Sequence, residues 1–249
     1  MRRLVACLAC RNNGSRLYGK PLQNLSIEKS LTILDYQIQL LKTISVISKI
    51  VLAISEGNDN IVFIDYAKKH NISYIIGSEI NVLNRLIDAC IHEKGTDIFR
   101  VTTESPYTYF EGIKKAWEDH QKFKRDFTKL DNVPDGANFE IIRLQALNKS
   151  QEFGEEKHKS ELCSLYIREN PGKFIIGDVT APDIIKRPDI RLTVDYPEDL
   201  ILCRNIYNSF EKLAPRIPIS KIINYIDENS HVKNLVDKYV DDGLKNMYV

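Results

Sequence analysis

Long apolar runs and an excess of one charge are both missing from this sequence. No stretch reaches the roughly 20 apolar residues that cross a bilayer, and the opening residues MRRLVACLACRNNG lack the longer apolar core of a signal peptide. Lys and Arg number 35 against 34 Asp and Glu, so bulk charge gives no reason to expect nucleic acid or an anionic membrane as a partner. We therefore expect a cytoplasmic protein without membrane insertion, in which any anion is bound by a local site.

The chain has only five cysteines, which is a small and odd number. Such a set argues against a disulfide scaffold. Cys7 and Cys10 form a C-x-x-C, but no second pair of ligands has the spacing of a zinc site. Residues three apart on a strand point to opposite faces, so a strand here keeps the two thiols apart. We expect both to be packed in the core.

The standard phosphate-loop signatures are absent as well. The chain has no G-x-G-x-x-G and no G-x-x-x-x-G-K-[ST], and Pro21 follows Lys20 where the second signature needs Ser or Thr. This excludes a Walker-type loop and the usual dinucleotide fingerprint.

Apolar strands alternate with helical patterns over residues 1–120. The expected strands cover residues 4–10, 49–55, 72–78 and 97–103, and the helices between them cover residues 31–45, 60–71 and 82–95. Buried strands separated by helices of this length predict a parallel sheet with helices on both faces. We therefore predict an α/β fold, a Rossmann-like three-layer αβα arrangement with a mostly parallel central sheet.

The rest of the chain is less regular. Residues 123–150 suggest a turn, a strand and a short helix, residues 161–170 a helix, residues 174–182 an extended arm, and residues 190–210 a strand that leads through Pro197 into a helix. No Gly-, Ser- or Pro-rich linker divides the chain. We expect a single domain over residues 1–249, built from a first half (1–120), a second half (121–215) and a helical tail (216–249).

The loop after the first strand concentrates cations and glycines. Ligands of open parallel sheets bind at the carboxyl ends of the strands, where glycines let backbone N–H groups turn toward an anion and Arg or Lys adds full charge. The residues of this loop that form a candidate phosphate grip are Arg11, Gly14, Ser15, Arg16 and Lys20. The alternative is a solvated basic loop.

The same loop resembles a family signature. ACRNNGSRLYGKPL is similar to the A-R-x-x-S-x-R-L-P-G-K-x-L of sugar-activating cytidylyltransferases, namely CMP-KDO synthetases, acylneuraminate cytidylyltransferases and the SpsF-like branch of spore coat polysaccharide biosynthesis, with Tyr18 where Pro is usual. IIGSEINVLNRLIDAC, FRVTTESPY, VPDGANFEII and IRLTVDYPEDLILCRNIY resemble further segments of the SpsF-like branch in the same order. The resemblance covers nearly the whole chain.

The resemblance implies a nucleotide-diphospho-sugar transferase type of fold and a reaction. Such an enzyme moves CMP from CTP to a sugar or sugar-acid acceptor, releases pyrophosphate and uses Mg²⁺. The first half of the chain then binds nucleotide, and the second half binds acceptor and forms a homodimer, for which residues 174–185 are the candidate segment.

The resemblance also assigns site residues. Arg11, Arg16 and Lys20 become catalytic, and Glu104 and Asp195 become the Mg²⁺ ligands. Nucleotide contacts are expected from the loop cations with Gly14 and Ser15, and further from Ala9, Gly77, Ser78, Arg85 and Arg100. Acceptor contacts are expected from Asn138, Glu140, Tyr166 and Arg168.

Several positions depart from the family pattern near this expected cleft. Glu104 and Asn138 stand where Asp is usual, Thr103 replaces Gly, Asn81 replaces Asp, and Leu162 stands where the branch often has His. A different acceptor or a loss of turnover would explain them. The alternative to an enzyme is therefore a catalytically silent relative that binds nucleotide or nucleotide-sugar as a partner protein. A third hypothesis, a glycosyltransferase, is the weakest, because that class needs a D-x-D metal motif and no D-x-D follows a strand.

Three residues keep competing interpretations. Asp195 could cap the helix that follows it, since Asp is favoured at helix starts, and Glu140 could be an exposed strand residue. Arg100 ends an apolar strand, so its charge needs a partner, for which phosphate or Glu104 would serve.

Overall fold

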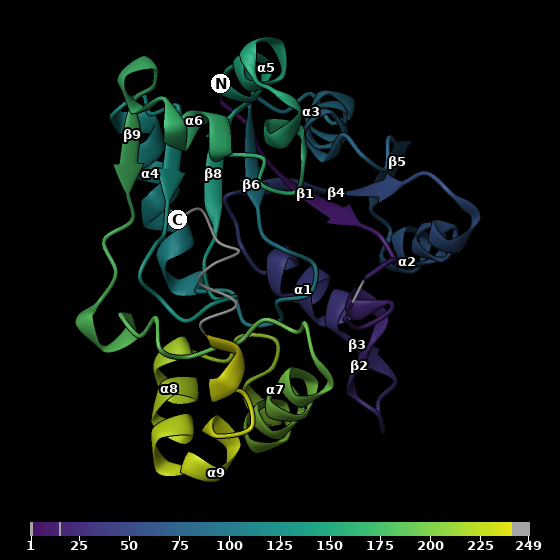
Figure 1. The fold of residues 1–249 in the computed structure, drawn as a ribbon, viewed down its shortest axis with the longest axis vertical. Helices are drawn as coiled ribbons and strands as arrows, with labels where there is room; N and C mark the ends of the chain where they lie inside the picture. Colours follow the sequence, from purple (N-terminus) through teal and green to yellow (C-terminus); the bar gives the residue numbers. More distant parts are fainter. Residues whose placement is uncertain (1, 15, 241–249) are drawn as a thin grey trace.

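A seven-stranded sheet forms the centre of the molecule (Figure 1). The computed structural model describes residues 2–14 and 16–240. The sheet order is β5-β4-β1-β6-β8-β7-β9. Its strands, in chain order, are β1 (Leu4–Cys10), β4 (Ile47–Ser55), β5 (Ser73–Gly77), β6 (Asp97–Arg100), β7 (Phe127–Lys129), β8 (Glu140–Arg143) and β9 (Ile176–Asp178). A separate two-stranded sheet joins β2 (Asn24–Ser26) to β3 (Leu31–Thr32).

The sheet is mostly parallel, as predicted. The strand pairs β1–β4, β1–β6, β4–β5 and β7–β9 are parallel. Only β8 runs the other way, antiparallel to both β6 and β7. Because β8 is reversed, its first residue, Glu140, pairs with Arg100 at the end of β6. The start of β8 therefore lies at the same edge of the sheet as the carboxyl ends of β1 and β6.

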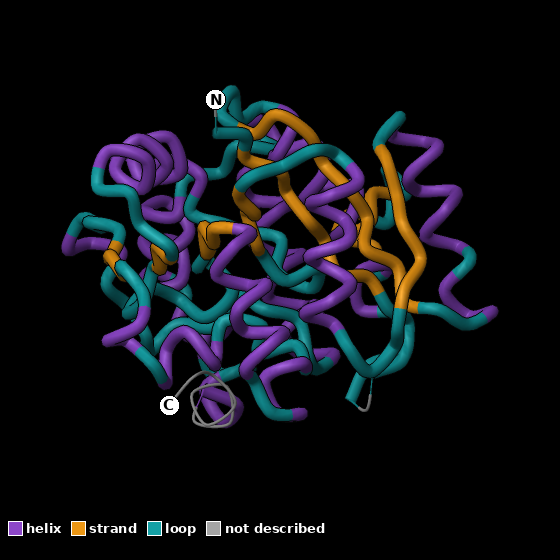
Figure 2. The backbone as a smooth tube through the Cα atoms, turned by 90° about the horizontal axis from the view of Figure 1, so that it is seen from above, coloured by secondary structure: helices purple, strands orange, loops and turns teal. Residues whose placement is uncertain are grey.

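Helices cover both faces of the sheet, which gives the three layers visible in Figure 2. They are α1 (Ile33–Lys42), α2 (Val62–His70), α3 (Val82–His92), α4 (Ile113–Lys122), α5 (Leu144–Phe153), α6 (Leu165–Glu169), α7 (Pro197–Phe210), α8 (Ile219–Glu228) and α9 (Ser230–Lys233). The three-layer αβα prediction is confirmed.

Strand β1 shows how the two layers arise. Its side chains alternate, so Leu4, Leu8 and Cys10 join the core cluster that contains α1, α7 and α8, whereas Val5 and Cys7 join the cluster of α3 and α5. Cys7 and Cys10 therefore lie on opposite faces, as the strand spacing predicted. All five cysteines are free and buried.

Three expected elements differ in the structure. Residues 190–196 form no strand, although one isolated bridge joins Asp135 to Arg191. The segment instead lies alongside two loops: the N–H groups of Leu192 and Val194 donate to the carbonyls of Asp135 and Glu104. Residues 123–150 hold two strands rather than one, and the helix expected over 161–170 shortens to α6.

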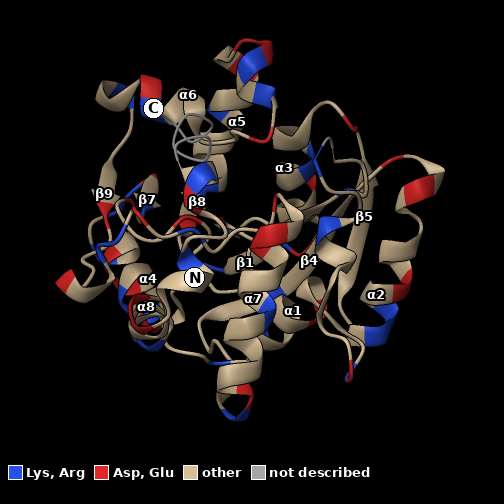
Figure 3. Cartoon of the chain, turned by 60° about the horizontal axis from the view of Figure 1, so that its bottom comes forward, with Lys and Arg blue, Asp and Glu red and all other residues tan. Residues whose placement is uncertain are grey.

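The second half of the chain extends the same sheet, and the tail packs on it. Strands β7, β8 and β9 follow residue 120, and α7 and α8 belong to the core cluster that covers β1. Charges of both signs are spread over the elements, as α2 illustrates in Figure 3. Among the described residues, no helix is long and apolar enough to cross a membrane.

A buried carboxylate fixes the start of α1. Thr32 caps the helix by accepting from the Asp35 N–H at 3.1 Å, while the Asp35 side chain accepts from the Thr32 hydroxyl at 2.9 Å. Lys69 and His70 at the end of α2 also contact Asp35, at 2.8 and 2.6 Å. Burial alone would raise the pKa of Asp35, but the hydrogen bonds from His70, Lys69 and Thr32 outweigh it and hold the pKa well below its usual range.

The first prediction concerns this carboxylate. Because the folded chain lowers the pKa of Asp35, the carboxylate stabilises the fold above its unfolded pKa of about 3.9, and the effect is lost as the pH falls. Asp35→Asn should lower the free energy of unfolding by about 1–3 kcal/mol at pH 7, and the difference from the wild type should shrink toward pH 2. Urea unfolding at several pH values measures it.

The matched control is Asp65→Asn, on the exposed face of α2. Asp65 is 75% exposed and pairs only with Lys68 at 3.7 Å among the described residues, so its substitution should change stability by less than about 0.5 kcal/mol at any pH. A difference between Asp35→Asn and wild type that stays constant from pH 7 to pH 2 would contradict the prediction.

Candidate active site

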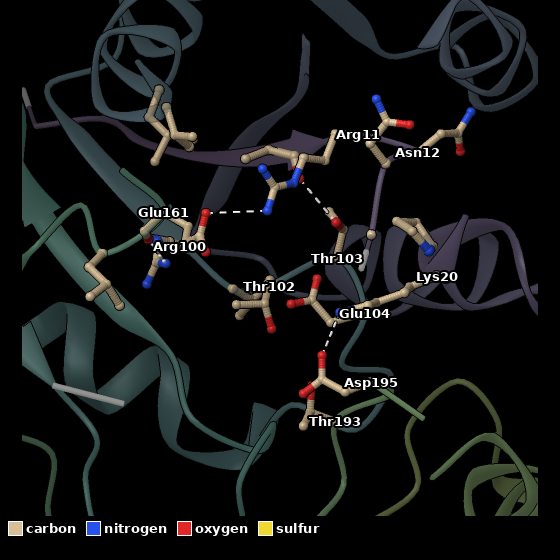
Figure 4. A pocket seen from close by; sticks show the side chains of 18 of the residues that line it. Arg11, Asn12, Lys20, Arg100, Thr102, Thr103, Glu104, Glu161, Thr193 and Asp195 are labelled. Carbon is tan, nitrogen blue, oxygen red and sulfur yellow. Dashed lines mark hydrogen bonds and ion pairs between the residues drawn. The ribbon is translucent and has the colours of Figure 1, made fainter. Parts of the chain in front are cut away.

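A cavity of about 330 Å³ opens at the carboxyl ends of β1 and β6. The loop after β1, the loop after β6, the segment before β8, the start of α3 and residues 193–195 surround it (Figure 4). Its lining residues include Ala9, Arg11, Asn12, Asn13, Gly14, Arg16, Lys20, Arg85, Arg100, Thr102, Thr103, Glu104, Asp135, Asn138, Glu161, Leu162, Thr193 and Asp195. This is the edge where parallel sheets bind ligands.

The loop after β1 is closed by backbone contacts. Gly19, whose φ of 58° lies in the left-handed region, donates its N–H to the Asn12 carbonyl at 2.8 Å. A side chain at Gly14 would place Cβ only 2.5 Å from the Leu17 carbonyl oxygen. A 3-10 turn, Lys20–Leu22, follows with Pro21 inside it. The turn fixes the backbone of Lys20 beside the cavity.

The loop cations meet carboxylates across the cavity. Lys20 Nζ lies 2.5 Å and Arg16 Nη2 3.6 Å from Asp195 Oδ1, and Arg11 Nη2 lies 3.3 Å from Glu161 Oε2 at the exposed rim. Figure 4 shows Lys20 and Asp195 joined by a dashed line beside Glu104. All three predicted phosphate-grip cations that the structure describes face one cavity; Ser15 lies outside the described residues.

Arg191 holds Asp195 from behind. Its side chain is 2% exposed, and it contacts Asp135 at 2.9 Å, Asp195 at 2.6 Å and Asp199 at 2.9 Å. Asp199 also accepts from the N–H groups of Asp195 and Tyr196 at 2.9 Å each, and Tyr196 rather than Asp195 is the N-cap residue of α7. The helix-cap interpretation of Asp195 is therefore wrong, and its carboxylate is left to face the cavity.

Glycine allows the segment before β8 to approach this network. Gly136 has a φ of 90°, and a Cβ there would lie 2.6 Å from the Thr193 nitrogen. Any larger residue would push the two segments apart. The close approach keeps Asp135 within reach of Arg191.

Glu104 and Asp195 have opposite electrostatic surroundings. Burial raises the pKa of Glu104, and the charge of Asp195 raises it further although Lys20 opposes both effects. Burial would also raise the pKa of Asp195, but Lys20 and Arg191 outweigh it and lower the pKa. Burial raises the pKa of Asp135 to about 6 despite Arg191. Glu104 and Asp195 therefore differ because Asp195 has direct contacts to Lys20 and Arg191, whereas burial dominates at Glu104.

The loop that carries Glu104 is fixed by α1 and β1. Gln37 is fully buried and donates to the carbonyls of Thr102 and Ser105 at 2.6 and 2.8 Å. The Thr103 hydroxyl donates to the Ala9 carbonyl at 3.0 Å. Thr103, which departs from the family pattern, thus joins the two strand ends on which the site is built.

A buried arginine lines the nucleotide side predicted from the sequence. Arg85 is 1% exposed, donates to the Ser78 carbonyl at 3.0 Å and forms no ion pair with any residue that the structure describes. Burial lowers its pKa. Gly77 packs against the Arg85 side chain so closely that a Cβ at Gly77 would lie 3.3 Å from Arg85 Cγ. Gly77 and Ser78 therefore hold Arg85 and do not themselves line the cavity.

The predicted acceptor residues separate into two groups. Asn138 lines the cavity. Glu140 is buried and contacts Arg100 at 2.8 Å, Arg168 at 3.0 Å and Ser164 at 2.6 Å, so its interpretation as an exposed strand residue is wrong. Burial by itself would raise the pKa of Glu140, but Arg100 and Arg168 lower it. This pairing also supplies the partner that Arg100 required.

The other two predicted acceptor residues lie behind the cavity wall. Arg168 contacts Asp131 at 3.2 Å in addition to Glu140. Tyr166 is buried in the core beside α5, with its ring 6.1 Å from that of Phe174. Glu140, Tyr166 and Arg168 do not line the cavity; Glu140 contacts Arg100, which does.

Several lining residues were not found from the sequence. Asn12 and Asn13 lie in the loop already singled out, and Thr193 stands inside the RLTVDYPEDL segment, so the motifs that contain them were the available signal. Asp135 stands inside VPDGANFEII, so that segment was its signal. Glu161 carries no comparable signal, because its place in the cavity depends on the chain before α6.

Two carboxylates, Glu104 and Asp195, are placed to hold a divalent cation. No group of three or more His, Cys, Asp or Glu side chains with metal-site geometry occurs in the described ranges 2–14 and 16–240. Mg²⁺ takes one or two carboxylates together with waters and substrate phosphates. Glu104 and Asp195 both line the cavity, and carboxylate oxygens are ligands that Mg²⁺ takes, so the residues present fit Mg²⁺.

Comparisons with known proteins agree with this geometry. A family model described as cytidylyltransferase matches residues 5–239. The spore coat polysaccharide biosynthesis protein SpsF of Bacillus subtilis is 25% identical over 234 residues, 92% of this chain and 96% of that protein.

Two solved structures share the fold. A cytidylyltransferase from Leptospira borgpetersenii superposes with a TM-score of 0.84 at 21% identity, covering 93% of this chain and 97% of that one. A CMP:2-keto-3-deoxy-manno-octonic acid synthetase complexed with CTP has a TM-score of 0.63 at 12% identity, covering 83% and 99%.

The second prediction tests the buried charge at Arg191. Arg191→Met leaves the buried Asp199 and the neighbouring Asp135 and Asp195 without their shared cation, so the free energy of unfolding should fall by about 3–5 kcal/mol. Arg187→Met is the matched control, because Arg187 pairs with Asp189 and Asp227, whose side chains are 47% and 48% exposed. The control should lose at most about 1 kcal/mol. Chemical denaturation measures both, and equal losses would contradict the prediction.

Proposed function

Since this chain belongs to the cytidylyltransferase family, we propose that it transfers CMP from CTP to a hydroxyl group of a sugar or sugar-acid acceptor, for the biosynthesis of a surface polysaccharide or glycan. The family membership makes it a nucleotidyltransferase. In the proposed reaction, an acceptor oxygen forms a bond to the α-phosphorus of CTP, the bond from that phosphorus to the bridging oxygen breaks, and pyrophosphate leaves. The hydroxyl proton passes to solvent.

The observation that carries the proposal is the arrangement of charge in the cavity. Arg11, Arg16 and Lys20 reach into it from the loop after β1, and two carboxylates, Glu104 and Asp195, face them. A triphosphate needs several cationic donors, because its oxygens repel one another and lose water on binding. The fully buried Arg85 supports the nucleotide side, since it lines the cavity without a carboxylate partner among the described residues.

We propose Mg²⁺ as the cofactor, held by Glu104 and Asp195. When bound, Mg²⁺ neutralises charge on the phosphate oxygens during phosphoryl transfer. Lys20 contacts Asp195 Oδ1; with a nucleotide bound, its ammonium group would pair with the phosphates, and Asp195 would then be available to hold Mg²⁺ together with Glu104. Arg191 keeps the other oxygen, Asp195 Oδ2, at 2.6 Å and so preserves the orientation of the carboxylate.

The acceptor is proposed to bind between the loop after β6 and the start of α6. Thr102, Asn138 and Leu162 line this side of the cavity. Behind them, Glu140 ties Arg100 to Arg168. The predicted acceptor residues Glu140, Tyr166 and Arg168 thus act as support for the wall that the acceptor meets.

We further propose a homodimer through the segment 174–185. This segment supplies β9, which pairs only with β7 among the described strands and so leaves one edge open. Ile175 and Ile184 in it are 54% and 51% exposed, and exposed apolar side chains beside an open strand favour self-association. Sedimentation velocity tests it: the wild type should sediment as a dimer and Ile184→Asp as a monomer, whereas a monomeric wild type would contradict the proposal.

The second candidate function is nucleotide binding without turnover. It is favoured by Glu104 and Asn138, which stand in the cavity where the family pattern has Asp. Glutamate places its carboxylate one methylene farther from the backbone, which octahedral Mg²⁺ coordination tolerates poorly. The same binding residues serve both functions, so only turnover separates them.

The third prediction measures both binding and turnover. Wild-type protein with Mg²⁺ should bind CTP more tightly than ATP, GTP or UTP by calorimetry, and should release pyrophosphate with one member of a panel of sugar acids, amino sugars and polyol phosphates. Lys20→Ala should weaken CTP binding about 10- to 100-fold, as expected for one charge-assisted contact. Lys29→Ala is the matched control, because Lys29 contacts only Glu211 among the described residues, outside the cavity.

The outcomes separate the candidates. CTP binding that Lys20→Ala weakens, with no pyrophosphate from any acceptor, would favour the silent relative. Turnover gained by the double variant Glu104→Asp with Asn138→Asp would favour it too, whereas a specialised enzyme should lose turnover on that change. A wild type that binds no nucleotide would contradict both functions.

A further inference from the structure

The ring of Tyr196 contacts two side chains from distant parts of the chain. Tyr239 stacks on it, with ring centroids 3.8 Å apart and planes inclined by 7°. The guanidinium of Arg16 lies 5.2 Å from the centroid of the same ring. Arg16 lines the cavity, so the aromatic pair joins the tail of the chain to the candidate phosphate site.

The tail is anchored at this place by further contacts. Tyr239 belongs to the 3-10 turn Asp237–Tyr239, which follows α9, and Figure 1 shows α8 and α9 beside α7. The Tyr239 hydroxyl donates to Glu198 Oε1 at 3.0 Å, and Lys238 Nζ lies 3.1 Å from the same oxygen. Val232 and Val236 are buried in the core cluster. Both anchors at Glu198 act on the first turn of α7, directly after Tyr196.

Arg16 has few other contacts that could define its position. Its ion pair with Asp195 is long, at 3.6 Å, and Lys20 and Arg191 contact the same carboxylate at 2.5 and 2.6 Å. A free arginine side chain has several rotatable bonds, and ordering it on ligand binding costs conformational entropy. A hydrogen bond to the Tyr196 side chain, followed by the charge of Asp195, raises the pKa of Arg16. The Tyr196 ring is thus the contact that places the guanidinium before a ligand arrives.

We propose that Tyr239 is a positioning residue for the triphosphate: it fixes the ring of Tyr196, which in turn holds Arg16 at the cavity. The assignment of a triphosphate to this cavity rests on the proposed function, but the link from Tyr239 to Arg16 does not. Tyr239 is not among the residues that line the cavity, so its effect passes through Tyr196. The tail of the chain then belongs to the nucleotide site.

The experiment compares three variants. Tyr239→Ala removes the stacked ring, and Tyr239→Phe keeps it and loses only the hydrogen bond to Glu198. Tyr225→Ala is the matched control for general loosening of the tail, because Tyr225 is also half-buried, lies on α8 and contacts Phe210 rather than Tyr196. Calorimetry with CTP and Mg²⁺ gives the dissociation constants.

The affinity for CTP should change only in the variant that loses the Tyr239 ring. Tyr239→Ala should bind CTP about three- to tenfold more weakly than wild type, the size expected from one aromatic pair, whereas Tyr239→Phe and Tyr225→Ala should stay within about twofold. Equal affinity of Tyr239→Ala and wild type would overturn the proposal. An equal loss in Tyr225→Ala would overturn it as well, because the effect would then be general.

A second measurement needs no nucleotide. The NMR signal of the Arg16 Nε–H group, assigned with Arg16→Lys, should be displaced by the Tyr196 ring in wild type and in Tyr239→Phe, and should move to its random-coil position in Tyr239→Ala. A signal that stays displaced in Tyr239→Ala would overturn the proposal. If wild type binds no CTP, the proposed function fails, and this signal alone decides whether Tyr239 positions Arg16.

Discussion

The buried guanidinium of Arg191 is the interaction on which the site depends. A cation that is 2% exposed must be paired, and Arg191 satisfies this by contacting Asp135 before β8, Asp195 before α7 and Asp199 within α7. These three carboxylates come from two segments that share no strand pairing beyond one bridge. The buried charge therefore joins the two segments as a β-ladder would, and it explains why residues 190–196 need not form a strand.

The positions of the cations in the loop after β1 follow from that arrangement. Once Asp195 is oriented by Arg191 and by its backbone contact with Asp199, it presents Oδ1 toward the loop after β1, where Lys20 and Arg16 reach it. Mutual pairing lets strongly charged groups lie in a partly buried cavity without an excess of one sign. In the proposed function, binding of a triphosphate would be an exchange of partners, in which phosphate oxygens replace the Asp195 and Glu161 carboxylates as acceptors for the loop cations.

The sequence predicted the parts of the site that local pattern determines. The apolar run of residues 4–10 located β1, the period of a strand placed Cys7 and Cys10 on opposite faces, and the cations and glycines that follow located Arg11, Arg16 and Lys20 at the cavity. It did not show that Glu140, Tyr166 and Arg168 lie outside the cavity lining, because the antiparallel direction of β8 pairs Glu140 with Arg100 and Glu140 in turn contacts Arg168. Register between distant strands is a tertiary property that periodicity does not contain.

The contact between the tail and the first loop is a second feature of the site that sequence periodicity does not contain. Arg16, Tyr196 and Tyr239 are separated by 180 and 43 residues, and no spacing rule relates them, yet their side chains form one continuous stack beside the cavity. The tail reaches this place because α8 and α9 bury Ile222, Ile226 and Val232 in the core shared with α7. Burial of apolar surface by the tail is nondirectional, whereas the aromatic pair at its end is directional. Apolar burial supplies the stability that keeps the tail in place. The aromatic pair links the position of the tail to the position of the Arg16 side chain.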